Sequence, residues 1–303
     1  MKKYKICKIL LVILAIFLCV AFYELLGICV AYKKQPEVSN TTKKETKNGS
    51  WNECSENTER AVIIEKNPEA LLQRVRLIKN AKKEIILSTF AFQSDESGKL
   101  ILGALHDAAD RGVHVRLLVD GMESWVDMEG NPYFYGLSSH ENVEIKLYNK
   151  ANPLKPWKMM GRMHDKYLIA DGKRYILGGR NTYNYFLGDF PGHKNYDRDV
   201  LVVCDEPEKE NSVNQLLEYF ETIWEQEDSG YFHDNKKLAN RKSVKNAVLE
   251  LQNGYQKYFE ENKERICDTD YTDETFETEK IALVSNPIHT GSKEPVVLSL
   301  IHI

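Results

Sequence analysis

The sequence predicts a layered α/β domain that follows an N-terminal membrane-spanning helix. Three observations lead to this prediction. Residues 9–32 contain a single charged side chain. Between residues 61 and 228, short runs of β-branched and aromatic residues alternate with amphipathic segments of helical period. Hydrophobic and charged residues make up 42% and 28% of the 303 residues, which is ordinary for a globular protein and excludes a fibrous or wholly disordered chain.

Residues 1–32 have the composition of an uncleaved signal anchor. Four lysines lie within the first eight residues, and the 24 residues from 9 to 32 would form about 36 Å of helix, enough to span a bilayer. A cleaved signal peptide is the alternative, although the small-residue cleavage site that it requires is weak here. The N-terminal lysines favour an extracytoplasmic domain, but four lysines between residues 33 and 44 oppose that orientation. Residues 33–60 are polar and predict a flexible tether.

The residue pattern predicts one folded lobe over residues 61–228. Residues 84–92 are nearly continuous in β-branched and aromatic side chains, as expected for a strand buried on both faces. Ser97 is placed to cap a helix that Gly112 ends. We expect strands at residues 62–64, 84–92, 113–120, 143–148, 163–170, 175–177 and 200–203, and helices that begin at Pro68, Ser97 and Ser212.

Beyond this lobe the composition changes. Residues 229–279 predict a connector, which begins as a polar helical segment at 236–265 and ends in an acidic loop. That loop, residues 268–279, holds six carboxylates and no basic residue. Residues 280–285 are apolar and predict the first strand of a new unit.

One segment carries the strongest chemical signal. It contains His164 and Lys166, then Asp171, and ends in Gly178-Gly179-Arg180-Asn181. On a strand, residues two apart share a face, so the imidazole and the ammonium project together. Glycines let the backbone approach a bound group closely. This set suits a phosphodiester: the histidine is a nucleophile or proton carrier, and the lysine and Asn181 hold anionic oxygens.

The spacing HxK-x4-D-x6-GGxN, filled at all six positions, resembles the signature of the phospholipase D superfamily. The likeness extends over roughly residues 68–225. Within the superfamily, the sequence looks most similar to bacterial, membrane-anchored proteins of the cardiolipin synthase type. Two features support this likeness: the residues Gly-Gly-Arg-Asn, and the basic, proline-containing segment that precedes the motif at residues 152–157. The resemblance implies a phospholipase D-type lobe, with a central mixed sheet flanked by helices.

The resemblance also implies a mechanism and a site. One histidine attacks phosphorus to form a phosphohistidine, a second protonates the leaving alcohol, and no metal or other cofactor takes part. Family members orient each histidine with a carboxylate before a hydrophobic strand, for which Asp199 fits best and Asp197 is the alternative. Asp171 is more structural than chemical by the same analogy. The expected catalytic residues are His164, Lys166, Asp171, Asn181 and Asp199, and the expected phosphate-binding residues are Lys166, Gly178, Gly179 and Asn181.

The chemistry of this family requires two such motifs, and this sequence contains one. Residues 229–279 resemble the bridge between two halves, and residues 280–303 resemble the beginning of a second lobe. Residues 298–303 match the translation of CTG TCT CTT ATA CAC ATC, a transposon-end adapter used in DNA library preparation. We hypothesise that the natural protein continues. The second motif then comes from a missing C-terminal half or from a homodimer partner.

Charge separates the functional alternatives. Four of the 41 Lys and Arg and one of the 45 Asp and Glu lie in residues 1–32, so the remainder carries 37 basic and 44 acidic residues, a net charge of about −7. The apolar N-terminal segment and the motif together favour a membrane-associated phosphatidyltransferase or phosphodiesterase that contacts a phospholipid membrane and a phosphatidyl substrate. The negative charge disfavours nucleic acid as a partner, and with it the alternative, a homodimeric single-motif nuclease. A non-catalytic domain that retains the motif is a third possibility.

Residues 150–162 form a basic stretch before the motif. Four basic side chains alternate there with Trp157 and two methionines. Tryptophan and lysine anchor well at bilayer surfaces, so the stretch fits a loop that faces lipid headgroups. A solvated loop fits the same composition, and the sequence leaves both interpretations open.

Overall fold

A computed structural model of the protein describes residues 2–33, 59–158, 161–204, 206, 211–233, 237–278, 281, 283 and 285. Its centre is one mixed sheet, in which β2, β3 and β4 are parallel and the other pairs are antiparallel. Along the sheet the strands follow the order β8 (Ser229–Tyr231), β4 (Val143–Tyr148), β3 (His114–Asp120), β2 (Glu84–Thr89), β5 (Tyr167–Ala170), β6 (Arg174–Gly178), β7 (Asp199–Cys204), β1 (Glu59–Ile64) and β9 (Phe276–Thr278).

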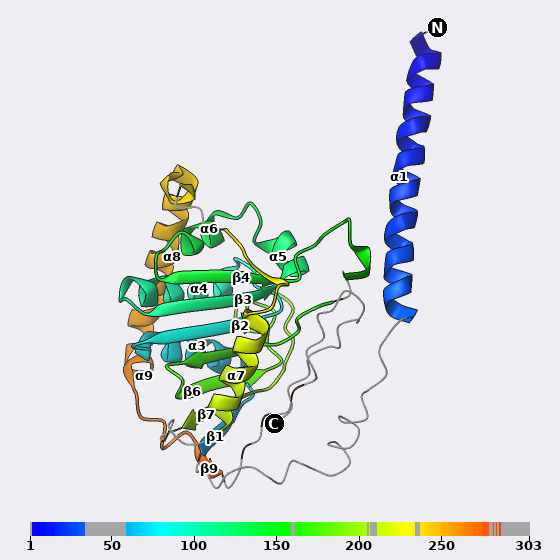
Figure 1. Ribbon diagram of the computed structural model, residues 1–303. Coiled ribbons are helices and arrows are strands. Elements are labelled where there is room, and N and C mark those ends of the chain that lie inside the picture. The colour runs from blue at the N-terminus through cyan, green and yellow to red at the C-terminus, as the bar shows by residue number, and fades with distance from the viewer. Residues whose placement is uncertain are drawn as a thin grey trace.

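Helices cover both faces of this sheet, which confirms the predicted layered α/β class. Successive strand residues point to opposite faces; Ile85 and Leu87 therefore join one apolar cluster and Ile86 joins the other. Behind the sheet in Figure 1 lie α3 and α4, and α7 crosses its front. The described helices are α1 (Lys2–Lys33), α3 (Asn67–Asn80), α4 (Glu96–Asp110), α5 (Gly121–Asp127), α6 (Pro132–Ser138), α7 (Ser212–Trp224), α8 (Lys242–Glu261) and α9 (Lys263–Cys267), with short 3-10 turns η2 (Pro156–Lys158) and η3 (Leu238–Asn240).

Two local predictions need correction. Ser97 does not cap α4, because the Asp95 carboxylate accepts the hydrogen bond from the Gly98 N–H at 3.0 Å and the Ser97 hydroxyl donates to Asp95 instead. A carboxylate at this position also interacts favourably with the helix dipole. The strand expected at residues 163–170 begins only at Tyr167. The strand expected at 143–148 is confirmed.

The segment after residue 228 packs closely on the lobe. Strand β8 extends the sheet beside β4, and α8 packs against α4 and α6 with a face that includes Leu251 and Tyr255. Close packing of α8 on α4 requires Gly103, since a Cβ there would lie 2.7 Å from the Leu251 carbonyl oxygen. Most of the expected second unit, residues 280–303, lies outside the described residues, as do residues 34–58 of the expected tether.

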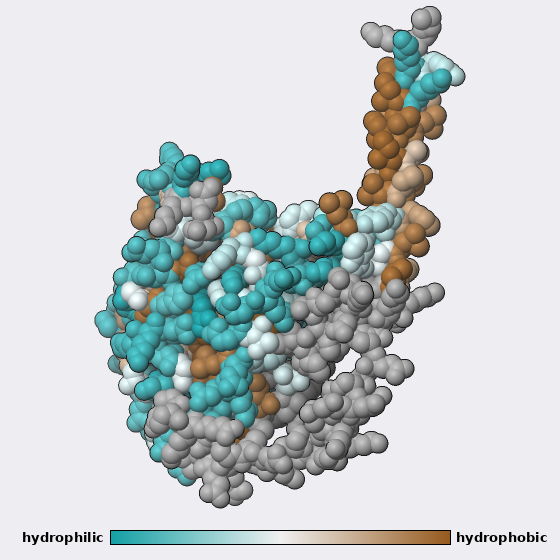
Figure 2. All heavy atoms as spheres, viewed as in Figure 1, coloured by the Kyte–Doolittle hydropathy of each residue, from teal (hydrophilic) through white to brown (hydrophobic). Residues whose placement is uncertain are grey.

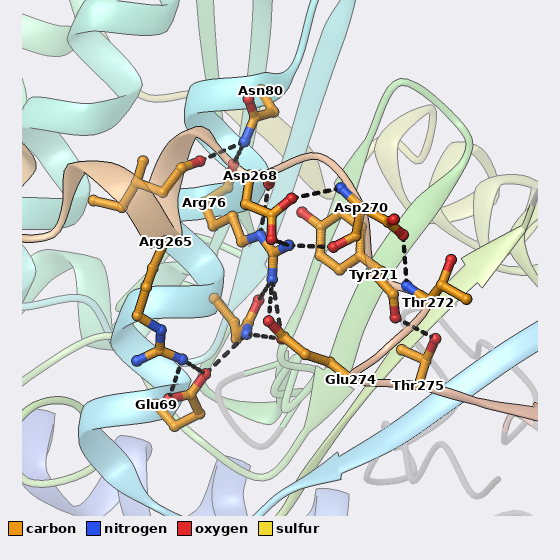
Figure 3. Close-up of polar contacts among 12 residues, drawn as sticks. Glu69, Arg76, Asn80, Arg265, Asp268, Asp270, Tyr271, Thr272, Glu274 and Thr275 are labelled. Atoms are coloured by element: carbon orange, nitrogen blue, oxygen red, sulfur yellow. Dashed lines mark hydrogen bonds and ion pairs between the residues drawn. The ribbon is translucent and has the colours of Figure 1, made fainter.

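A buried arginine holds the acidic loop that follows α9 (Figure 3). Arg76 on α3 is 1% exposed. It donates to the carbonyl oxygens of Asp268 and Asp270 and to the Glu274 carboxylate at 2.7–3.0 Å. The Tyr271 ring lies 3.9 Å from its guanidinium. The excess negative charge of this loop is therefore partly neutralised inside the fold.

Replacing that arginine is expected to loosen the acidic loop. Arg76→Ala removes four hydrogen bonds to partly exposed partners, so we expect a loss of about 2–3 kcal/mol of unfolding free energy. Limited proteolysis should then cut between residues 268 and 275, and the Tm should fall. Arg265→Ala is the matched control: its pair with Glu69 at 2.8 Å is half exposed, and we expect less than about 1 kcal/mol. Equal Tm shifts in the two variants would contradict this account.

The N-terminal helix stands apart from the lobe (Figure 1). Within Tyr4–Val30 of α1, an 18-residue window reaches a mean hydropathy of 2.9, and the helix is long and apolar enough to cross a membrane. Figure 2 shows its apolar surface beside an otherwise largely hydrophilic lobe. Its principal contact with the lobe is made by η2.

Candidate active site

The segment that carries His164 lies just before β5 and outside the sheet ladder. Its position follows from two hydrogen bonds. Gly178 N–H donates to the Lys166 carbonyl at 3.1 Å, which continues the β5–β6 hairpin by one residue. Further upstream, the Met163 N–H donates to the Asp120 carboxylate at 3.0 Å instead of to a neighbouring strand. The strand therefore starts later than predicted, and His164 lies between these two attachments.

Asp120, at the end of β3, organises this region. It is 1% exposed, and besides the Met163 N–H it accepts hydrogen bonds from the first backbone N–H groups of α5. It also forms an ion pair with Arg162 at 2.8 Å. Burial raises the pKa of the Asp120 carboxyl, and the Arg162 guanidinium opposes that shift. Sequence patterns did not identify Asp120, because its partner at position 162 is 42 residues away.

The His164 ring packs edge-on against Phe90, with 4.7 Å between ring centroids. Arg162 and Lys166 also approach the same phenyl ring, at 4.9 and 5.4 Å. Burial, followed by the positive charges of Lys166 and Arg162, lowers the pKa of His164 below its usual 6.5. The imidazole is thus kept neutral at neutral pH, as a nucleophile requires.

Lys166 is the candidate cation of the site. Its side chain is nearly buried, and Nζ donates to the His164 carbonyl oxygen at 2.6 Å. Burial lowers the pKa of Lys166 to about 8, although the carboxylates of Asp165 and Asp197 act to raise it. Asp165 accepts a hydrogen bond from the Tyr219 hydroxyl at 2.7 Å. The His164 imidazole and the Lys166 ammonium both lie at the Phe90 ring, although neither residue belongs to the strand on which the spacing argument placed them.

Gly178 and Gly179 leave room for two carboxylates. A Cβ at Gly178 would lie 2.1 Å from Oδ1 of Asp199, and one at Gly179 would lie 2.1 Å from Oδ2 of Asp197. We expected these glycines to let a bound group approach. The structure shows that they make room for Asp197 and Asp199, and their contact with substrate phosphate stays a prediction.

Asp199 pairs with arginines, and no hydrogen bond or ion pair joins it to His164 among the described residues. It pairs with Arg74 of α3 at 2.9 Å and with Arg180 at 3.2 Å, and all three side chains are buried. Our expectation that Asp199 orients the histidine therefore does not match its position. The alternative, Asp197, is the carboxylate that lies against Gly179 and attracts the Lys166 ammonium.

Asn181 and Asp171 have different surroundings. The Asn181 amide oxygen accepts from the Ala91 N–H at 3.2 Å, which leaves its NH₂ group as the possible donor to a ligand. Asp171 instead accepts from the backbone N–H groups of Lys82, Lys83 and Glu84 at 2.7–3.1 Å. These contacts tie the β5–β6 turn to the start of β2, in agreement with the structural role that the resemblance implies.

Comparison with known proteins identifies the family. Residues 74–224 match the family model described as the phospholipase D-like domain of cardiolipin synthase. The chain belongs to the phospholipase D superfamily. Superfamily members act on phosphodiesters, and the matched segment contains His164, Lys166, Asn181 and both candidate carboxylates.

The chain is also similar to individual known proteins. The chain is 31% identical over 212 residues to an uncharacterized protein of Helicobacter pylori (strain J99), and 29% identical over 171 residues to cardiolipin synthase C of Escherichia coli. These alignments cover 65% and 52% of this chain but only 39% and 34% of those relatives. The solved structure of NucT from Helicobacter pylori matches 57% of this chain and 99% of its own, with 18% identity and a TM-score of 0.44.

The two shifted pKa values predict a bell-shaped pH profile. On the acid side, kcat/KM should rise as His164 loses its proton below pH 6.5, because only the neutral imidazole attacks phosphorus. On the alkaline side it should fall as Lys166 loses its proton near pH 8, because the site then loses its positive charge for the phosphate. Initial rates with a soluble phosphodiester measure this profile. A rate that stays level from about pH 7 to about pH 10 would show that Lys166 is not the required cation.

Proposed function

We propose that this protein is a membrane-anchored phosphatidyltransferase of the cardiolipin synthase type. The observation that carries the proposal is the site itself: a neutral histidine beside a nearly buried lysine, on a lobe attached to a membrane-length apolar helix. Matches to cardiolipin synthases support the choice of a lipid substrate. The N-terminal lysines favour the extracytoplasmic face for the lobe.

The proposed reaction is a double displacement at phosphorus. A ring nitrogen of His164 attacks the phosphodiester of a phosphatidyl donor, the bond from phosphorus to the leaving alcohol breaks, and a second histidine gives that alcohol its proton. The acceptor hydroxyl then attacks the phosphohistidine and returns a proton to the second histidine. Water in place of the acceptor gives hydrolysis. Lys166 and the Asn181 NH₂ group would hold the non-bridging oxygens in both steps.

The second histidine must come from another motif. We propose that it is supplied by sequence beyond this lobe or by a second copy of the chain. Within the lobe, Asp197 is our choice for the carboxylate that positions His164, because it lies against Gly179 and its charge reaches Lys166. Asp199 is already paired with two arginines.

A lipid-transfer assay tests the proposal. Full-length protein in mixed micelles receives labelled phosphatidylglycerol, and the products are separated by chromatography. Conversion to cardiolipin is the expected result, and phosphatidic acid would identify hydrolysis by the same site. Degradation of labelled DNA without any turnover of lipid would overturn the proposal and favour the homodimeric nuclease.

A further inference from the structure

The loop between β4 and the His164 segment is seated on the anchor helix. The Tyr23 hydroxyl donates to the Leu154 carbonyl oxygen at 2.9 Å. At Gly27, a Cβ would lie 2.3 Å from Cγ of Pro156, so the absence of a side chain permits this contact. Figure 1 shows that this loop reaches away from the sheet to α1.

The contact lies close to one end of the candidate membrane span. Gly27 and Tyr23 are three and seven residues before Val30, the last residue of that span, or about 4.5 and 10 Å along a helix. The polar headgroup region and the adjoining acyl chains occupy this depth if α1 crosses a bilayer. A loop held at this position is therefore next to lipid.

The side chains of the loop suit that environment. Leu154 is 77% exposed, although it is a large apolar residue. Next to it, Lys155 is exposed and has no ion-pair partner among the described residues. An apolar side chain that enters the acyl region beside a cation that meets phosphate is the usual pattern at a membrane surface.

The backbone of the loop is held in place from the lobe side. The Asn149 side chain donates to the carbonyl oxygens of Lys158 and Gly161, each at 2.6 Å, and Lys158 pairs with Asp228 at 2.7 Å. Three residues after Gly161 the chain reaches His164. The position of the loop on α1 therefore helps to determine where the active site lies relative to the bilayer.

We infer that residues 152–158 form a membrane-contacting loop, seated on Gly27, that inserts Leu154 into a phospholipid surface and holds the His164 segment near the headgroups. This inference rests on the proposed membrane function. It decides between the two interpretations that the composition of residues 150–162 left open. The partner is a bilayer containing anionic phospholipid, whose phosphates face Lys155.

Photo-crosslinking of the full chain tests the inference. A benzoylphenylalanine replaces one residue at a time, and the protein is reconstituted in vesicles of phosphatidylethanolamine and phosphatidylglycerol with a trace of radiolabelled phosphatidylglycerol. Three positions are compared: Leu154, Phe17 within the anchor, and Leu249, which is 57% exposed on α8 at the opposite side of the lobe from α1 (Figure 1). We expect label at positions 17 and 154, at least about fivefold above position 249.

The three positions separate the possible failures. If position 17 is labelled but position 154 shows only the background label seen at position 249, the loop inference is wrong and the proposed membrane function stands. No label at position 17 would overturn the proposed membrane function, and the loop inference with it.

A second variant tests the seat itself. Gly27→Leu introduces a side chain where Pro156 packs, so the label at position 154 should fall severalfold while the label at position 17 is unchanged. Leu25→Phe adds bulk at a neighbouring exposed position of α1 and should leave both signals unchanged. Unchanged label at position 154 in Gly27→Leu would show that Gly27 does not seat the loop.

Discussion

His164→Ala is expected to lower the rate of phosphatidyl transfer by at least about 10³-fold, because the substitution removes the imidazole that we propose forms the phosphohistidine. The loss should appear in kcat, since the imidazole takes part in bond formation and contributes little to binding the substrate. Transfer of labelled phosphatidylglycerol at saturating substrate measures it. The thermal unfolding of the variant should stay close to that of the original protein.

His114→Ala is a suitable control for this experiment. His114 is also a histidine at the sheet, but it is half exposed, and its ring nitrogens lie 3.4 and 2.8 Å from the carboxylates of Glu84 and Glu144. Its loss should change the rate less than about twofold. An unchanged rate in His164→Ala, or an equal loss in both variants, would remove His164 from the proposed mechanism.

Asp199→Ala is expected to have the largest effect on stability. Arg74 and Arg180 are buried, and the substitution leaves both guanidinium groups without their carboxylate. Breaking a buried ion pair in this way typically costs about 3–5 kcal/mol, which corresponds to a fall in Tm on the order of 10 °C for a domain of this size. Thermal unfolding of the purified protein in detergent, followed by circular dichroism, measures the shift.

Asp197→Ala tests whether Asp197 positions His164, whereas Asp199 stabilises the fold. Asp197 makes no ion pair among the described residues, so its loss should change Tm by only a few degrees. If Asp197 positions His164, the same variant should lower kcat by about 10²-fold and shift the acid side of the pH profile. If Asp197→Ala lowered the Tm strongly and Asp199→Ala left the Tm unchanged, Asp197 would be the structural carboxylate, which contradicts our assignment.

Much of the lobe is predictable because its signals are local. The strand at residues 143–148 follows from a run of alternating and apolar residues, and the end of α4 follows from Gly112, whose φ is 86°. The motif is predictable for the same reason. His164, Lys166, Asp171 and Asn181 all belong to one hairpin and its flanks, so their spacing in sequence already implies their proximity.

The carboxylates show where local signals are insufficient. Asp197 and Asp199 lie two residues apart before the same apolar run, and both fit the family pattern. The difference between them is made by Arg74, which is 125 residues from Asp199. Nothing in the periodicity around residue 199 indicates that an arginine on α3 points toward it.

By itself, the sequence determined the membrane-length helix, the α/β class and the superfamily, and it nominated the candidate histidine and lysine of the site. Only the tertiary structure decided that Asp120 fixes the His164 segment, that Asp199 is paired with arginines, and that the loop before the motif lies on α1 at Gly27. The physical reason is that helix and strand formation depend on neighbours within a few residues. Buried ion pairs and close backbone contacts depend instead on which distant segments the packed sheet and helices bring together.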